Sequence, residues 1–242
     1  MKELVFEISD TMEDILTAEL IEKGYTSFYI EKTGNRNYIK LYLNTNDIPS
    51  VLANEIFVSS AEVDPSTWNR AWGETYNGDE LTSDIFVLPE GKTLPDKEYE
   101  IIIKIDPFDS FGDGHHPTTR LCGILLEEIL KKPGIKRRVS TLSMLDIGTG
   151  SGILSIAAWA LGVRDIELFD YDQVSVEKAV KNLKMNGIIS PVPFVADIYQ
   201  YTTDKKFDLI TANLLSRLLE DNIKKLIELL KPEGCLIVSG VS

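Results

Sequence analysis

The chain has 242 residues, of which 43% are hydrophobic and 26% are charged, and its formal net charge is −13. This composition predicts one large or two modest globular domains, and the negative charge disfavours non-specific binding to nucleic-acid phosphates. No apolar run approaches the ~20 residues that span a bilayer, the first eight residues do not resemble a secretory signal, and two distant cysteines form no zinc or disulfide pattern, so we expect a cytoplasmic protein without membrane contact.

The first 62 residues predict a small α+β domain. Apolar patterns indicate strands at residues 4–8, 28–30 and 38–43, and helices at residues 12–21 and 48–57. This β-α-β-β-α order is typical of a ferredoxin-like domain. Because the segment has no glycine loop and no cluster of catalytic residue types, we expect it to bind or orient a partner.

Residues 63–98 are interpreted as a linker. Trp68 and Trp72 lie four positions apart and would share one face of a helix. We interpret them as hydrophobic anchors of a linker helix rather than as substrate contacts. Strands are also expected at residues 85–88 and 100–105.

The next segment carries both histidines of the chain, His115 and His116, directly before Pro117. Proline suits the first turn of a helix. Apolar residues follow it at helical spacing and are expected to form the buried face, namely Leu121, Ile124, Leu125 and Ile129. The segment is therefore either a capped loop that begins a helix or a loop whose polar groups close over a ligand. A metal site is not expected, because adjacent histidines project differently and no third ligand is placed.

The central feature of the chain is a strand that leads through a glycine-rich turn into a helix, with Asp146 before Gly148, Gly150 and Gly152. Such glycines let a ligand approach the main chain, and the first N–H groups of the helix would face that ligand. One interpretation is a turn of any α/β protein. The dinucleotide pattern G-x-G-x-x-G fits imperfectly, because its last glycine is replaced by Ile153 or, counted from Gly150, by Ser155. The spacing is typical of Rossmann-like methyltransferases that use S-adenosylmethionine (SAM).

Further strands alternate with helices after this turn, at residues 164–170, 192–196, 207–213 and 235–238. This alternation predicts a parallel sheet that binds its ligand at the carboxyl ends of the strands. Asp170 ends the first of these strands, about 20 residues after the glycines, where a carboxylate can bind both hydroxyls of a ribose. Asp172 is expected to cap the next helix, Asp197 to accept a hydrogen bond from an adenine amino group, and Asn213 to end a strand at the same edge.

Three motifs resemble those of the PrmA family, the SAM-dependent methyltransferases of ribosomal protein L11. The family's Phe-Gly-Thr-Gly-x-His-Pro-Thr-Thr loop is similar to residues 111–119, its Asp-x-Gly-x-Gly-Ser-Gly-Ile-Leu loop to residues 146–154, and its Ala-Asn-Ile-Leu-Ala pattern to residues 212–216. Asp113 stands where the family has threonine. The family's usual fold adds a final helix and a strand pair, which we expect to be missing after the fifth strand.

The resemblance implies a class I methyltransferase domain of Rossmann-like α/β fold over residues 99–242, behind the small domain of residues 1–62, which would present the substrate. By position it implies that SAM is contacted by Thr119, Gly148, Asp170 and Asn213. The patterns above add Asp146, Gly150, Gly152 and Asp197 as candidate cofactor-binding residues.

We therefore expect a SAM-dependent protein N-methyltransferase that acts on lysine side chains or the N-terminus of a basic ribosomal protein, protein L11. Asn213 would accept a hydrogen bond from the neutral amine. His116 is the second candidate catalytic residue, interpreted as a loop-positioning group rather than a general base. Open alternatives are a SAM-dependent methyltransferase for another protein, a small molecule or a nucleic acid, and a non-catalytic SAM-binding protein, with an oxidoreductase as the most distant.

Overall fold

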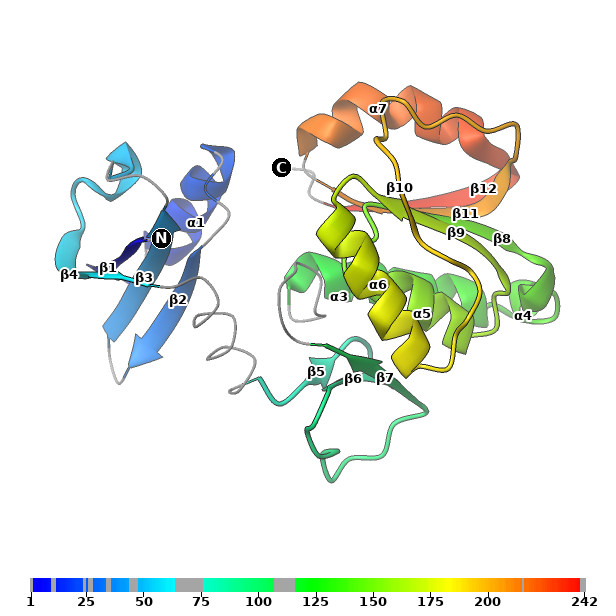
Figure 1. The fold of residues 1–242 in the computed structure, drawn as a ribbon, viewed down its shortest axis with the longest axis horizontal. Helices are drawn as coiled ribbons and strands as arrows, with labels where there is room; N and C mark the ends of the chain where they lie inside the picture. Colours follow the sequence, from blue (N-terminus) through cyan, green and yellow to red (C-terminus); the bar gives the residue numbers. More distant parts are fainter. Residues whose placement is uncertain are drawn as a thin grey trace. The chain divides into compact units, whose positions relative to one another are not determined.

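The protein folds into two compact units, Met1–Trp72 and Gly73–Ser242. The computed structural model, drawn in Figure 1, describes residues 2–9, 12–23, 25, 28–33, 36–43, 48–63, 76–106, 116–214 and 216–239. The predicted linker anchors, Trp68 and Trp72, lie outside the described residues, and so does most of the motif at residues 111–119.

A four-stranded antiparallel sheet with one helix packed against it forms the first unit. Its elements are β1 (Lys2–Ile8), α1 (Glu13–Glu22), β2 (Phe28–Thr33), β3 (Arg36–Leu43), the short 3₁₀ helix η2 (Ser50–Leu52) and β4 (Ile56–Glu62). The strand order is β2-β3-β1-β4, and every neighbouring pair is antiparallel. Leu4, Phe6 and Ile8 alternate along β1 and pack with Leu16 and Leu20 of α1 in the core of the unit. This arrangement matches the predicted ferredoxin-like sheet.

The helix predicted at residues 48–57 is wrong. Only the single turn of η2 forms there, and β4 begins at Ile56 and pairs with β1. Apolar residues at helical spacing suggested the helix, and one of them, Leu52, is indeed buried in the core. However, Ile56, Phe57 and Val58 are residue types that favour a strand, and the free edge of β1 offers them a partner.

The second unit contains a five-stranded parallel sheet and a smaller three-stranded sheet. Its elements are β5 (Asp79–Glu80), β6 (Ile85–Pro89), β7 (Ile101–Ile105), α3 (Pro117–Lys131), α4 (Pro133–Lys136), η3 (Val139–Thr141), β8 (Ser143–Ile147), α5 (Ile153–Ala160), β9 (Asp165–Asp170), α6 (Gln173–Met185), β10 (Phe194–Val195), β11 (Phe207–Asn213), α7 (Ser216–Leu229) and β12 (Leu230–Ser239). The large sheet has the order β10-β9-β8-β11-β12 and the small sheet the order β5-β6-β7. Every strand predicted around and after the glycine turn is present.

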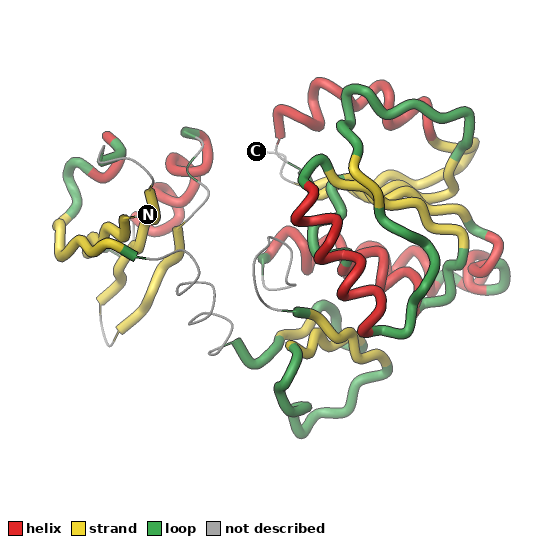
Figure 2. The backbone as a smooth tube through the Cα atoms, viewed as in Figure 1, coloured by secondary structure: helices red, strands yellow, loops and turns green. Residues whose placement is uncertain are grey.

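Helices cover both faces of the large sheet. In the ribbon of Figure 1 and the tube of Figure 2, α3, α5 and α6 lie on one face, whereas α7 lies on the other. The chain runs from β8 outward to β9 and β10, and then returns to β11 and β12 on the other side of β8. The order of the strands therefore reverses between β8 and β11, and ligands of open parallel sheets bind outside the carboxyl ends of the strands at such a reversal. The predicted Rossmann-like α/β fold is confirmed.

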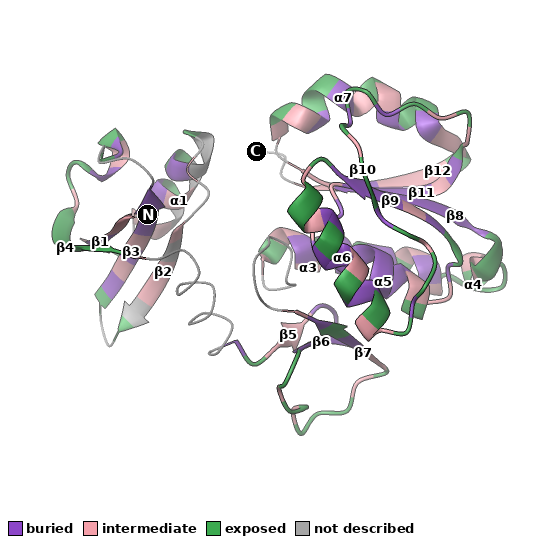
Figure 3. Cartoon of the chain, viewed as in Figure 1, coloured by how far each residue is buried: buried purple, intermediate pink, exposed green. Residues whose placement is uncertain are grey.

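The core of the second unit lies around its central strands, coloured as buried in Figure 3. All five residues of β8 are buried, because helices cover the sheet on both sides. Leu145 and Ile147 of β8 pack with Phe207 and Ile210 of β11 and with Leu226 of α7.

Helix α3 begins at Pro117, as predicted, but buries a face that the apolar pattern did not select. Cys122, Leu126 and Leu130 are buried, whereas Leu121 and Leu125 are exposed. The buried face packs on α5, β11 and β12, elements of the same unit. No helix in the described part of the chain is both long and apolar enough to cross a membrane.

The small sheet belongs to the second unit, although the predicted linker at residues 63–98 contains β5 and β6. Lys131 of α3 joins it through ion pairs with Asp84, at 2.5 Å, and with Glu100, at 3.0 Å. Burial alone would lower the pKa of Lys131, but its carboxylate partners outweigh burial and raise it. The network fixes the small sheet against α3.

Candidate functional site

The carboxyl ends of the parallel strands gather the predicted site residues at one edge of the large sheet. The glycine loop follows β8, Asp170 ends β9, and Asn213 ends β11. Asp197 lies two residues after the end of β10. The residue between them, Ala196, donates its N–H to the carbonyl of Asp170 at 2.9 Å, which keeps this segment beside the end of β9. The first turn of α3 reaches the same edge through a hydrogen bond from Asn213 to Thr119.

The glycine loop turns the chain through three left-handed residues, because φ is 66° at Gly148, 53° at Gly150 and 79° at Gly152. Residues with a Cβ resist these angles. The N–H groups of Gly148 and Thr149 both donate to the carbonyl of Phe169 at 3.0 Å, which fixes the loop to β9. Helix α5 then begins after Gly152 without a side-chain cap, so its first N–H groups point toward the loop.

A side chain at Gly148 would meet the end of the Leu214 side chain. A Cβ at this position would lie 2.3 Å from Cδ2 of Leu214, the residue that follows Asn213. The glycine loop and the end of β11 therefore touch where the strand order reverses.

Asp146 lies behind the loop and is only 2% exposed. Its carboxylate accepts hydrogen bonds from the hydroxyls of Thr149 and Ser155, each at 2.7 Å, and of Thr211, at 2.6 Å. Burial raises the pKa of Asp146, and the three hydroxyl groups act in the opposite direction. Asp146 thus ties the loop to α5 and β11. Its contact with a cofactor stays a prediction.

Asp170, at the end of the neighbouring strand β9, holds the glycine loop through a hydrogen bond. Its two oxygens accept hydrogen bonds from the N–H of Gly150, at 2.9 Å, and of Asp172, at 3.1 Å. A carboxylate has about four lone-pair sites, so Asp170 retains acceptor capacity for a ligand. Asp172 is confirmed as a helix cap, because it accepts hydrogen bonds from the N–H groups of Val174 and Ser175 at the start of α6.

Asp197 is exposed, and its carboxylate accepts a hydrogen bond from the N–H of Tyr199 at 2.9 Å. Tyr171, which directly follows Asp170, is 79% exposed. Aromatic faces stack on planar rings, so Tyr171 is a further candidate for contact with a base. The sequence analysis missed it, although an aromatic residue next to the ribose-type carboxylate was the signal to notice.

Asn213 is held between α3 and β12. Its Nδ2 lies 3.2 Å from Oγ1 of the buried Thr119, and its Oδ1 lies 2.5 Å from Oγ of Ser239. Burial raises the pKa of the nearby Cys122 thiol, whereas a hydrogen bond with Ser239 acts in the opposite direction. The sequence analysis missed Ser239, because a single serine at a strand end belongs to no motif.

His116 is the N-cap of α3. Its Nδ1 accepts a hydrogen bond from the N–H of Thr118 at 3.3 Å and lies 2.7 Å from the hydroxyl of the same residue. Because Nδ1 accepts, a neutral ring carries its proton on Nε2. His116 therefore caps α3, and its parts in positioning the loop and in catalysis stay predictions.

The carboxylates at this edge have no basic partners among the described residues. No ion pair between described side chains includes Asp146, Asp170 or Asp197, although ion pairs are frequent elsewhere in the chain, for example around Lys131 and Lys181. The partners of these carboxylates are hydroxyl groups and main-chain N–H groups. The edge is therefore electronegative and suits a ligand with positive charge.

The family model described as "Ribosomal protein L11 methyltransferase (PrmA)" matches residues 3–242. The chain belongs to the PrmA family. A relative named ribosomal protein L11 methyltransferase in Ruminiclostridium cellulolyticum is 31% identical over 96% of this chain and 76% of its own length. A relative of the same name in Enterococcus faecalis is 36% identical over 79% of this chain and 58% of its own.

A solved PrmA-type structure supports the fold. The crystal structure of ribosomal protein L11 methylase from Lactobacillus delbrueckii subsp. bulgaricus is 34% identical, with a TM-score of 0.59, and the match covers 68% of this chain and 80% of the other. The match spans 57% of the length of further curated relatives, such as that of Bacillus pumilus.

Proposed function

We propose that this PrmA-family chain is a SAM-dependent N-methyltransferase that modifies amino groups of ribosomal protein L11. The observation that carries the proposal is the electronegative strand edge, where Asp170 lies beside a glycine loop that it holds through Gly150. Family membership supports the reaction class, and the names of the relatives support the substrate.

The residues at the edge fit SAM on chemical grounds. A ribose presents two hydroxyl donors, and Asp170 retains acceptor sites for them. The three loop residues with positive φ angles are glycines, so the loop has no side chains at the places where a nucleoside would approach the main chain. A sulfonium gains from carboxylates that no described basic side chain neutralises.

Asn213 is the group that we assign to the amine. SAM supplies a methyl group bonded to a positively charged sulfur, so the protein has mainly to position a neutral amine in line with that bond. A lysine side chain in water has a pKa of ~10.4, and desolvation favours its neutral form. The carbonyl of Asn213 already accepts from Ser239 and has a second lone pair for an N–H of the amine. The amine nitrogen then bonds to the methyl carbon as the carbon–sulfur bond breaks, and its surplus proton passes to solvent.

The domain roles belong to the same proposal. We assign substrate presentation to residues 1–62, a connecting role to the part of residues 63–98 that precedes β5, and SAM binding to residues 99–242. The net charge of −13 suits a basic protein substrate. A cytoplasmic location, where the ribosome is assembled, follows from that substrate.

The test is incubation of the purified chain with radiolabelled SAM and separated ribosomal fractions, followed by mass spectrometry of each labelled protein. We expect label in protein L11, on lysine side chains or the N-terminus, and labelling about 100-fold slower with Asn213→Ala. Label in RNA, in small molecules or in another protein would contradict the substrate. SAM binding without transfer to any fraction would favour a non-catalytic SAM-binding protein.

A further inference from the structure

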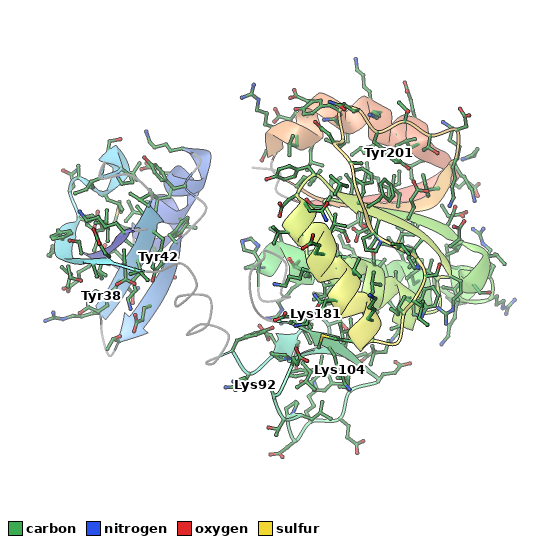
Figure 4. All side chains as sticks on the ribbon, in the orientation of Figure 1. Tyr38, Tyr42, Lys92, Lys104, Lys181 and Tyr201 are labelled. Carbon is green, nitrogen blue, oxygen red and sulfur yellow. The ribbon has the colours of Figure 1, made fainter. Side chains whose placement is uncertain are left out.

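One edge of β7 is bound by the side-chain amides of Asn182 in α6 and of Asn186, the C-cap of α6. The main-chain N–H of Lys104 donates to Oδ1 of Asn186 at 2.9 Å, and Nδ2 of Asn186 donates to the carbonyl of Lys104 at 2.7 Å. One turn earlier on α6, Oδ1 of Asn182 accepts the N–H of Asp106 at 2.8 Å. Lys104 and Lys181, labelled in Figure 4, mark this junction of β7 and α6. The side-chain amides of Asn182 and Asn186 thus bond the main-chain groups at this edge of β7, which a neighbouring strand would otherwise bond.

Asn182 differs from Asn186 in a second bond. Its Nδ2 donates to the carbonyl of Ser151, inside the glycine loop, at 2.8 Å. Asn182 is completely buried, and a buried amide destabilises the fold unless its polar atoms are hydrogen-bonded. Because the N–H of Asp106 can only donate and the carbonyl of Ser151 can only accept, the orientation of this amide is fixed.

The bond to Ser151 orients one peptide plane of the loop. The carbonyl of that plane is held by Asn182, and its N–H, that of Gly152, donates to the carbonyl of Thr149 at 2.8 Å. With both ends held, the plane cannot rotate, and it leads directly into the first turn of α5. The direction of the first N–H groups of α5 therefore depends on Asn182.

We propose that Asn182 is a positioning residue for the SAM site: its amide ties the end of β7 to the glycine loop and sets the loop's affinity for the cofactor. The inference rests on the proposed function in one respect, that SAM is the ligand of the loop. It adds a residue that no motif of the sequence marked, and it assigns β7 a part in the site.

Asn186 provides a matched control. It is the C-cap of the same helix, one turn after Asn182, and bonds the same strand, but among the described contacts it has no bond to the loop. We would measure SAM affinity by calorimetry, and hydrogen exchange of peptides covering residues 148–156 without SAM, in wild type, Asn182→Ala and Asn186→Ala. Asn182→Ser serves as a milder second variant if the alanine variant does not fold.

We expect loss of the Asn182 amide to weaken SAM binding about 10-fold and to speed exchange in the loop, whereas Asn186→Ala changes affinity less than about 2-fold at a similar melting temperature. Equal weakening by both variants, or no weakening by Asn182→Ala, would overturn the proposal. If the wild type binds no SAM, the proposed function fails. The exchange measurement then still decides whether Asn182 holds the loop, and unchanged exchange would refute that as well.

Discussion

Each end of the large sheet holds a carboxylate on one of its inner strands, and the surroundings shift the pKa values of these two carboxylates in opposite directions. At the amino end of β11, Asp208 accepts hydrogen bonds from the N–H of Ser143, at 2.9 Å, and from Nζ of Lys231, at 2.7 Å. Burial alone would raise the pKa of Asp208, but these partners outweigh burial and lower it. At the carboxyl end of β8, Asp146 is bonded by hydroxyl groups, and burial raises its pKa.

The difference shows where the fold leaves negative charge without a matching cation. Lys231 and Arg138 accompany Asp208, whereas the described part of the chain offers no ion pair to Asp146 or Asp170. A cationic ligand at the carboxyl end would supply the positive charge that Lys231 supplies at the amino end. The comparison therefore separates an end whose carboxylate is paired with cations from an end whose carboxylates are bonded, among the described residues, by hydroxyl and main-chain N–H groups.

The largest effect should come from Asn213→Ala, which changes the carboxyl end at the point of reaction. We expect kcat to fall about 100-fold, while the Kd for SAM changes less than about 3-fold, because the ribose and loop contacts remain. Single-turnover methylation with SAM-saturated enzyme is the measurement. An unchanged rate would remove Asn213 from the reaction.

The comparison is tested most directly by the same chemical change at both ends. Asp170→Asn should weaken SAM binding about 10-fold or more, because an amide is a poorer acceptor for two ribose hydroxyls than a carboxylate. Asp208→Asn is the matched control and should leave the Kd within about 2-fold, since it lies at the opposite end of the sheet. Calorimetric titration with SAM gives both values. Similar weakening by both variants would refute the division of the sheet into two ends.

The pKa directions predict opposite pH dependence. The pKa of Asp208 is lowered in the folded state, so its stabilisation is present above the unfolded pKa and is lost as the pH falls through the folded value. Asp208→Asn should lower the free energy of unfolding by about 1–2 kcal/mol at neutral pH, with the difference shrinking in acid. The pKa of Asp146 is raised, so its contribution is present below the unfolded pKa and is lost as the pH rises through the folded value.

The wild type should therefore lose stability relative to Asp146→Asn as the pH rises, because only the wild type has a buried carboxyl group to ionise. Asparagine can keep the hydrogen bonds at this position, because hydroxyl groups accept as well as donate. Urea unfolding of both variants between about pH 3 and pH 8 checks the two signs. Parallel curves for the two variants would contradict the assignment.

The smallest effect concerns a carboxylate at the carboxyl end that serves the fold. Asp172→Ala removes the cap of α6 and should lower the free energy of unfolding by about 1 kcal/mol, with SAM affinity within about 2-fold. Asp172→Asn keeps the cap and should be close to wild type in stability. A large loss of SAM affinity in either variant would show that charge at this edge matters more than the position of Asp170.

The sequence predicted the features of the second unit that follow from main-chain geometry. Glycines at 148, 150 and 152 indicated a turn that needs positive φ, and apolar runs indicated the strands that deliver Asp170 and Asn213. The residues that hold these groups could not be predicted. Asn182, Thr211 and Ser239 act through one or two side-chain hydrogen bonds to elements distant in sequence. An isolated polar residue in an apolar pattern has no spacing to recognise.

The errors have an equally specific origin. Periodicity does not say what covers an element, so the segment at residues 48–57 suggested a helix although β1 offered a strand edge. In α3 the same approach found the helix but selected residues that are exposed, such as Leu121 and Leu125. The small buried residues that face α5 and β12, such as Cys122, gave no comparable signal.

The contact between Gly148 and Leu214 makes these two positions share one volume. A methyl group at 148 would meet the end of the Leu214 side chain, so the leucine would have to move aside. Alanine at 148 would also have to accept the strain of the left-handed turn. A substitution in the glycine loop at 148 would therefore be felt first at the end of β11, one residue after Asn213.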